Sequence, residues 1–259
     1  ILLTDWALSL GMYRRVILYF FFILLFAVGL LSPVIAQLPA ARITAVFPMG
    51  CKVGGETEVK VYGSDLEGAT GLYFSQTGIS GKLLSSSEHK FQVKVASAVP
   101  PGVYEVRFVG ALGVSNPRPF VVGTINELYS TGDNDSIEKA FPITRQSIVN
   151  ASVIARKSQW FRLKCDQNQR ILLRLTAESL DSKLDPIMVL RNKEGDRLAR
   201  ADKKGLIDYA QSAAGDLYLQ IHDSSFAGGV EYFFRVENIT NGAHVDFVYP
   251  SVVPNSEES

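Results

Sequence analysis

The residues that could carry catalysis are few and form no recognisable constellation. The three histidines, His89, His222 and His244, stand in no nucleophile or metal motif. The sequence has no Gly-x-Ser-x-Gly, no His-Glu-x-x-His and no glycine loop that would cradle a phosphate before a helix. In turn-rich β structure, aspartate more often shapes loops than reacts, and this applies to Asp181, Asp185, Asp196, Asp202 and Asp208. The sequence therefore predicts a protein that is not an enzyme and holds no catalytic residue.

Binding is the chemistry that the sequence favours. Period-two alternation places Trp160, Tyr218 and His222 on the outer face of their predicted strands. Aromatic rings on a rigid sheet bind sugars or peptides, and polar neighbours fix the ligand's orientation. The expected partner is an extracellular polysaccharide or protein. The alternative for each ring is packing against a loop or a neighbouring domain.

The composition limits the number of domains and the classes of partner that the chain can have. The chain has 259 residues, of which 47% are apolar and 20% charged, which suits one or two globular domains with proper cores. The 26 basic residues balance the 26 acidic ones, so nucleic acid and anionic membrane surfaces are not indicated as partners. Cys51 and Cys165 have no Cys or His neighbour at zinc-ligand spacing. We expect two buried free thiols, with a disulfide between them as the alternative.

Residues 41–122 alternate in short segments, such as Thr57 to Gly63, Phe91 to Val95 and Val103 to Val109. Glycine and proline punctuate them every 8–12 residues, which predicts six or seven strands in an antiparallel β-sandwich. Val46-Phe47-Pro48, Gly54-Gly55, the run from Val59 to Leu66 and the closing Ser115 to Val122 resemble an IPT/TIG domain. That resemblance implies an immunoglobulin-like fold found in cell-surface and secreted proteins, and it implies no particular ligand.

Residues 144–237 alternate in the same way and predict a second all-β sandwich. The pattern is similar to the bacterial pre-peptidase C-terminal (PPC) domain, and these are the segments that carry the similarity: Trp160-Phe161-x-Leu163, Leu184-Asp185-Pro186, Glu194-Gly195, Ala214 to Leu219 and Tyr232 to Val236. The resemblance implies a jelly-roll-like module that serves binding or secretion and lacks catalytic residues. The tandem order also resembles large exported proteins of planctomycete-type bacteria.

The acidic stretch 123–143 lacks periodicity and is expected to be a linker. Hard cations prefer several oxygen ligands, so its Asp/Asn cluster could seed a calcium site, and the alternative is a hydrogen-bonded turn. Some PPC relatives bind calcium through such a linker, and here Asn134 and Asp135 are the matching residues. Gly132 stands where the family has Glu, and Lys157-Ser158-Gln159 replaces the acidic residues before the strand. These departures argue against the calcium site, and no other cofactor is indicated.

The amino-terminal segment reads as an export signal. Arg14-Arg15 precedes an apolar run from Val16 to Leu31, and small residues lead up to Ala36. This order is typical of a secretory signal peptide, with cleavage expected after Ala36. An uncleaved anchor is the alternative, although 16 apolar residues are short for a span of about 20. We expect a periplasmic, cell-surface or extracellular protein with no membrane contact beyond the signal segment.

The carboxyl-terminal segment repeats an earlier one. Ala41 to Pro48 aligns without gaps to Ala243 to Pro250, with Ala, Val and Pro identical. The repeat predicts that 243–259 begin a further IPT-like domain, with chance similarity as the alternative.

Together these features predict two tandem β-sandwiches that form a non-catalytic, exported adhesion or substrate-targeting module at the cell envelope. The alternatives are an accessory segment of a secreted peptidase or other hydrolase, and a structural spacer in a surface assembly. The sequence indicates neither the ligand nor the oligomeric state.

Overall fold

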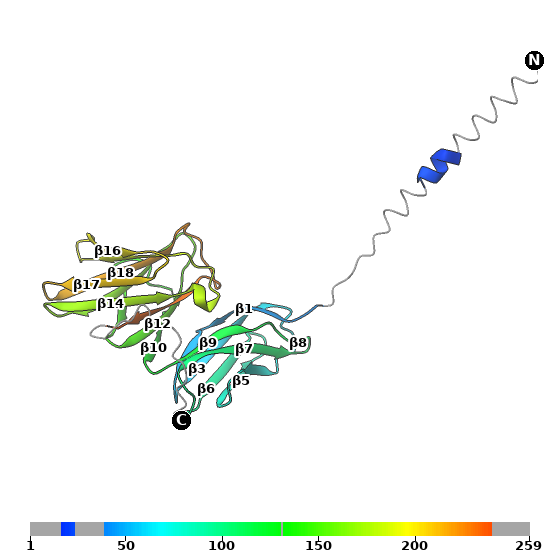
Figure 1. The fold of residues 1–259 in the computed structure, drawn as a ribbon, viewed down its shortest axis with the longest axis horizontal. Helices are drawn as coiled ribbons and strands as arrows, with labels where there is room; N and C mark the ends of the chain where they lie inside the picture. Colours follow the sequence, from blue (N-terminus) through cyan, green and yellow to red (C-terminus); the bar gives the residue numbers. More distant parts are fainter. Residues whose placement is uncertain (1–16, 24–38, 131, 240–259) are drawn as a thin grey trace, which may run out of the picture. The chain divides into compact units, whose positions relative to one another are not determined.

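The computed structural model describes residues 17–23, 39–130 and 132–239 (Figure 1). The described residues fall into two units, one within residues 1–39 and the other within residues 40–259. In the first unit, residues 17–23 are helical, with exposed side chains. Within the described residues, no helix is both long and apolar enough to cross a membrane. The expected cleavage point after Ala36 and the expected third domain at 243–259 lie outside the described residues.

The second unit is all-β and contains two sandwiches, as predicted. The first has nine strands: β1 (Arg42–Phe47), β2 (Gly50–Lys52), β3 (Glu56–Ser64), β4 (Gly71–Phe74), β5 (Ile79–Ser85), β6 (Lys90–Val95), β7 (Gly102–Gly110), β8 (Gly113–Val114) and β9 (Arg118–Gly123). One layer runs β1-β3-β6-β5 and the other β4-β7-β9-β2, and the two join where β4 pairs with β5. This is the strand order of an immunoglobulin-like sandwich.

The alternation read from the sequence explains this sandwich. In β3, Thr57, Val59 and Val61 are buried while the residues between them face outward. Phe91 and Phe108 meet edge-to-face in the core, with ring centroids 6.2 Å apart. Each strand thus contributes one apolar face to a shared interior, which is where hydrophobic burial stabilises the fold.

The second sandwich has ten strands and one short 3₁₀ helix: β10 (Asn126–Tyr129), β11 (Phe141–Ile143), β12 (Ser147–Ser152), β13 (Gln159–Cys165), β14 (Gln169–Thr176), η1 (Glu178–Leu180), β15 (Pro186–Arg191), β16 (Arg197–Ala201), β17 (Leu206–Gln211), β18 (Gly215–Asp223) and β19 (Phe233–Asn238). The sheets run β10-β12-β19-β14-β17 and β11-β13-β18-β15-β16. Strands β12–β19 pair as nested antiparallel partners, the first with the last and so inward to β15 with β16. Such a nested ribbon, rolled into two sheets, is a jelly roll.

The two sheets of the jelly roll enclose one apolar core. Phe161 from one sheet and Phe234 from the other meet edge-to-face at 6.0 Å. Leu184, Met188 and Leu190, from the Pro-broken segment and the strand after it, are buried in the same core. Their apolar side chains fix the path of this stretch, while its aspartates lie in the connecting turns or at strand ends.

The segment expected to be a linker, 123–143, contributes two of these strands. β10 pairs in parallel with β12 and β11 pairs in parallel with β13, so both extend the sheets of the jelly roll. The segment escaped prediction because each strand is only three or four residues long and lies at a sheet edge. In so short a strand, the alternation of apolar and polar residues cannot be distinguished from the sequence of a polar turn.

Candidate functional site

The three predicted binding residues come together on one sheet face. Trp160 of β13 lies in register with Gln220 of β18, and Tyr218 and His222 flank Gln220 on the same side of β18. Diagonal neighbours on a sheet face are about 7–8 Å apart, within reach of aromatic side chains. We call this outer surface of β11-β13-β18-β15-β16 the aromatic face; its residues are Trp160, Tyr218, Gln220, His222 and Phe226.

Exposure divides these residues. Trp160 and His222 are half-buried, as expected for rings on an open sheet. Tyr218 is only 8% exposed, which corrects the expectation of an exposed ring. It does lie on the outer side, but its register partners on the two neighbouring strands are Arg162 and Arg191. The long side chains of Arg162 and Arg191 flank Tyr218 and cover its ring. The period-two pattern of one strand does not predict such cover, because it depends on the two neighbouring strands.

His222 is part of a stacked pair that the sequence did not reveal. Its ring lies parallel to that of Phe226, with centroids 4.4 Å apart and an interplanar angle of 3°. Phe226 is 46% exposed and has φ of 56°, a left-handed conformation that is uncommon for a bulky residue. The pair presents an aromatic surface at the carboxyl end of β18, the central strand of the sheet.

Asp223 holds the loop that carries Phe226. Its buried carboxylate accepts hydrogen bonds from the Ser225 hydroxyl (2.6 Å) and from the backbone N–H groups of Asp185, Ser225 and Ala227. Burial alone would raise the pKa of Asp223, but these hydrogen bonds outweigh it and lower the pKa. The carboxylate therefore fixes the turn that positions the exposed ring.

Polar groups next to the rings are also fixed. The Gln220 amide accepts a hydrogen bond from Arg191 Nε (2.9 Å) and donates one to Ser158 Oγ (2.9 Å). Arg191 in turn donates to the Gly195 carbonyl (2.8 Å). A planar amide thus lies in a set orientation beside Trp160, and a guanidinium holds it from the far side of β18.

The predicted calcium residues are engaged in other contacts. Asn134 is buried, accepts a hydrogen bond from Ser130 Oγ and donates one to the Trp160 carbonyl (both 2.8 Å). Asp135 is ion-paired to Lys157 (2.7 Å) and Lys139 (3.3 Å), and these contacts lower its pKa. Among the described residues, no three His, Cys, Asp or Glu side chains gather to hold a metal. Calcium at Asn134 and Asp135 stays a prediction, and binding would require Asp135 to give up its lysines.

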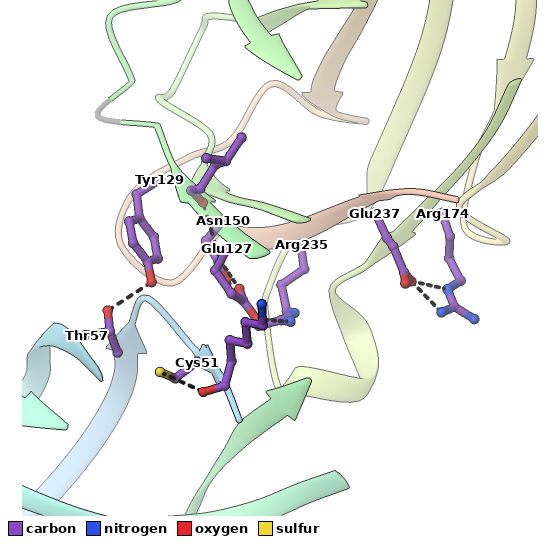
Figure 2. Close-up of polar contacts among 10 residues, drawn as sticks. Cys51, Thr57, Glu127, Tyr129, Asn150, Arg174, Arg235 and Glu237 are labelled. Carbon is purple, nitrogen blue, oxygen red and sulfur yellow. Dashed lines mark hydrogen bonds and ion pairs between the residues drawn. The ribbon is translucent and has the colours of Figure 1, made fainter. Parts of the chain in front are cut away.

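A second cluster, which sequence reasoning missed, belongs to the second sandwich and lies where it meets the first. Glu127 of β10 and Arg235 of β19 form an ion pair at 2.6 Å, and their side chains are only 3% and 7% exposed (Figure 2). Asn150 of β12 donates to Glu127 and accepts from Arg235 Nη1. A buried ion pair is stable only when its remaining polar atoms are satisfied, and Asn150 meets this need.

The first sandwich closes over this ion pair. A Cβ on Gly50 of β2 would lie 1.8 Å from Arg235 Nη1 and 2.8 Å from the Val121 carbonyl, so only glycine leaves room for the guanidinium. Beside it, Thr57 Oγ1 and the Tyr129 hydroxyl are hydrogen-bonded at 3.0 Å (Figure 2). The burial of Tyr129 raises its pKa. Four buried apolar residues complete the joint: Ala45, Met49, Leu180 and Phe233.

The thiols play no part in either cluster's chemistry. Cys51 and Cys165 are buried and free, as predicted. Burial raises the pKa of each thiol to about 11, so both are protonated and poor nucleophiles at neutral pH.

Comparisons with known proteins give only distant likenesses. No protein-family model and no curated protein matches the sequence, so neither the IPT/TIG nor the PPC resemblance has a family match behind it.

Three solved structures illustrate the distant similarity in fold. A periplasmic inhibitor of g-type lysozyme from Aeromonas hydrophila is 10% identical, with a TM-score of 0.32, over 43% of this chain and 98% of its own. The pre-peptidase C-terminal domain of a Bacillus anthracis collagenase is 13% identical, with a TM-score of 0.31, over 38% of this chain and 93% of its own. SGBP-B of a mixed-linkage glucan utilization locus from Bacteroides ovatus is 12% identical, with a TM-score of 0.27, over 78% of this chain and 75% of its own. Likenesses this remote leave the function to be inferred from the chain's own geometry.

Proposed function

We propose that this chain is an exported, non-catalytic binding module that attaches to extracellular polysaccharide through the aromatic face. Its role would be adhesion or substrate targeting at the cell envelope. The observation that carries the proposal is the grouping of Trp160 with the His222–Phe226 stack around the fixed amide of Gln220.

Sugar chemistry fits this surface better than an ionic ligand does. A sugar ring has an apolar C–H face, which packs on an aromatic ring, and hydroxyl groups at its edge, which need fixed donors and acceptors. Trp160 and Phe226 supply partly exposed rings, and Gln220 and Arg191 supply oriented polar groups. Because the face is an open sheet, it suits a long chain that lies across it.

The proposal is tested by binding of the purified protein to immobilised polysaccharides, followed by substitution of the rings. Trp160→Ala and Phe226→Ala are each expected to weaken binding about tenfold, which corresponds to about 1.4 kcal/mol for a central aromatic contact. Tyr73→Ala is the matched control, because Tyr73 is an exposed ring on the first sandwich (58%). Equal affinities for all four proteins, or no binding to any polysaccharide, would refute the role of the aromatic face.

A further inference from the structure

Four arginines share the outer surface of β11-β13-β18-β15-β16 with the aromatic rings. Arg162 and Arg191 are the register partners of Tyr218 on its two sides. Arg197 is in turn the register partner of Arg191, and a β-bulge in β16 adds one residue between Arg197 and Arg200, so that both face outward. Residues in register project to the same side of a sheet. We call these residues the arginine row: Arg162, Arg191, Arg197 and Arg200.

The charges of the arginine row are left unpaired by residues 39–130 and 132–239. Six other arginines form ion pairs with aspartate or glutamate: Arg107, Arg118, Arg145, Arg170, Arg174 and Arg235. On the opposite sheet of the same sandwich, Arg170 and Arg174 each have a carboxylate partner on a neighbouring strand. No described carboxylate pairs with the arginine row in this way. The aromatic face therefore carries a positive charge that the opposite sheet lacks.

This arrangement has a cost that an anion would remove. Like charges that lie opposite each other on neighbouring strands destabilise a sheet, and Arg191 and Arg197 are directly in register. Asp216 lies on the same surface, but its register partner is Lys164, so its charge is already offset. An anionic group over the row would relieve the repulsion and accept charge-assisted hydrogen bonds. The row therefore favours an anionic ligand over a neutral one.

Arg191 is oriented in advance for such a ligand. Its Nε donates to the Gln220 side chain (2.9 Å) and its Nη1 to the Gly195 carbonyl (2.8 Å). Its Nη2 has no bond to a described residue and is not fully buried, so a ligand oxygen can reach it. Arg197 and Arg200 are exposed on β16, the strand at the end of the sheet. A guanidinium fixed in this way loses little side-chain entropy when it binds a carboxylate or sulfate.

The rings distinguish a charged sugar from other anions. A small inorganic anion would leave Trp160 and the His222–Phe226 stack without a role. A nucleic acid favours proteins with an excess of positive charge, whereas here 26 basic residues balance 26 acidic ones. Trp160 and Arg200 lie at the two ends of one line of register partners that runs through Gln220. Because strands lie about 4.8 Å apart, cations recur across the sheet as charges recur along an acidic sugar polymer.

We propose that the ligand of the aromatic face is an acidic polysaccharide, and that the arginine row binds its carboxylate or sulfate groups. This inference rests on the proposed function, because it names the class of polysaccharide that the same face binds. The polymer lies across the strands, with a sugar ring on Trp160 and its charged groups over β15 and β16.

The test compares the binding of the purified protein to acidic polymers and to neutral polymers of the same backbone. The pairs are polygalacturonate and its methyl ester, hyaluronan and its methyl ester, and dextran sulfate and dextran. For at least one pair, the acidic polymer is expected to bind at least tenfold more tightly than its neutral counterpart. The first two pairs test carboxylate and the third tests sulfate, so the pattern also identifies the anionic group.

Two double variants locate the charge that binds the polymer. Arg197→Gln combined with Arg200→Gln is expected to weaken binding of the acidic polymer about tenfold, or about threefold for each exposed ion pair. Arg170→Gln combined with Arg174→Gln is the matched control, because it removes two charges from the opposite sheet. Its Kd should stay within about twofold of the wild-type value. Equal weakening by the two double variants would assign the effect to net charge and refute the arginine row.

Other results would also overturn the inference. They are equal affinity for the two members of every pair, equally tight binding of poly-L-glutamate, and equally tight binding of single-stranded DNA. Equal affinity within the pairs would leave the proposed function standing, because a neutral sugar would then bind at the rings. Binding of poly-L-glutamate that needs Arg197 and Arg200 but persists in Trp160→Ala would instead refute the role of the rings and with it the proposed function.

Discussion

At the scale of single residues, Gly50 shows how one missing side chain admits a charge into an interface. Its φ is ordinary, so the glycine is required for space and not for backbone conformation. Arg235 cannot move aside easily, because Glu127 and Asn150 hold its guanidinium. The contact is therefore sensitive to a change of one methyl group.

We predict that Gly50→Ala destabilises the protein by about 1–3 kcal/mol, the cost of overpacking a close contact. The measurement is the midpoint of urea unfolding. Gly71→Ala is the control, since its Cβ would meet only the Gly81 carbonyl at 3.8 Å. The control should be unchanged or slightly more stable because alanine restricts the unfolded chain. A Gly50→Ala midpoint equal to that of the control would show that Arg235 is not confined by the first sandwich.

The interface residues also show what sequence alone cannot supply. Glu127 and Arg235 are 108 residues apart, and no local pattern links them. The only signal was Arg235 inside the otherwise apolar run Tyr232 to Val236. For Trp160, Tyr218 and His222, parity predicted the correct side of the sheet. It could not predict the burial of Tyr218, which depends on the lengths of the side chains on two neighbouring strands.

At the scale of elements, strands were predictable where alternation persisted over five or more residues. β3, β6, β7, β13, β14 and β18 were all read from their period-two pattern. β10 and β11 were not, because each owes its conformation to pairing with a neighbouring strand and not to its own short sequence. The turn after β18 was predictable only in part. An aspartate is typical of a turn, but the four hydrogen bonds that Asp223 accepts could not be predicted from the sequence.

We predict that this turn makes stability depend on pH in the acid range. The folded state lowers the pKa of Asp223, so its carboxylate stabilises the fold fully above the unfolded pKa of about 3.9. This contribution disappears as pH falls through the lower pKa of the folded state. Asp223→Asn is therefore expected to cost about 1–3 kcal/mol at pH 7, and the difference from wild type should shrink below about pH 3.9.

Urea unfolding at pH 7, 5, 3.5 and 2.5 measures this dependence. Asp216→Asn, at the start of the same strand, is the control and should change stability by less than about 0.5 kcal/mol. A difference between wild type and Asp223→Asn that stays constant down to pH 2.5 would contradict the proposed ionic contribution. The same variant should also loosen the His222–Phe226 stack, which the Asp223 turn positions.

At the scale of the whole molecule, two sandwiches of different topology form one compact unit, which the structure describes from residue 40 to residue 239, residue 131 excepted. The class of each sandwich follows from its strand pattern, but their joint does not. An apolar cluster and the Thr57–Tyr129 hydrogen bond cross it, and Gly50 of the first sandwich packs against Arg235 of the second. A hollow of about 380 Å³ is lined by residues of both sandwiches, so its shape depends on this joint.

The ion pair lies within the second sandwich, but its Arg235 packs against Gly50 of the first, so breaking the pair is expected to weaken the joint and uncouple the two sandwiches in unfolding. Glu127→Gln leaves Arg235 buried without its counter-charge, which costs about 3–5 kcal/mol. Scanning calorimetry should show one transition for wild type and two for Glu127→Gln, because each sandwich keeps its own core when the joint is weakened. Arg170→Gln is the control: it breaks the exposed Arg170–Asp208 pair inside the second sandwich, and should cost less than about 1 kcal/mol without splitting the transition. A single transition in Glu127→Gln, at the wild-type temperature, would mean that the joint does not depend on this pair.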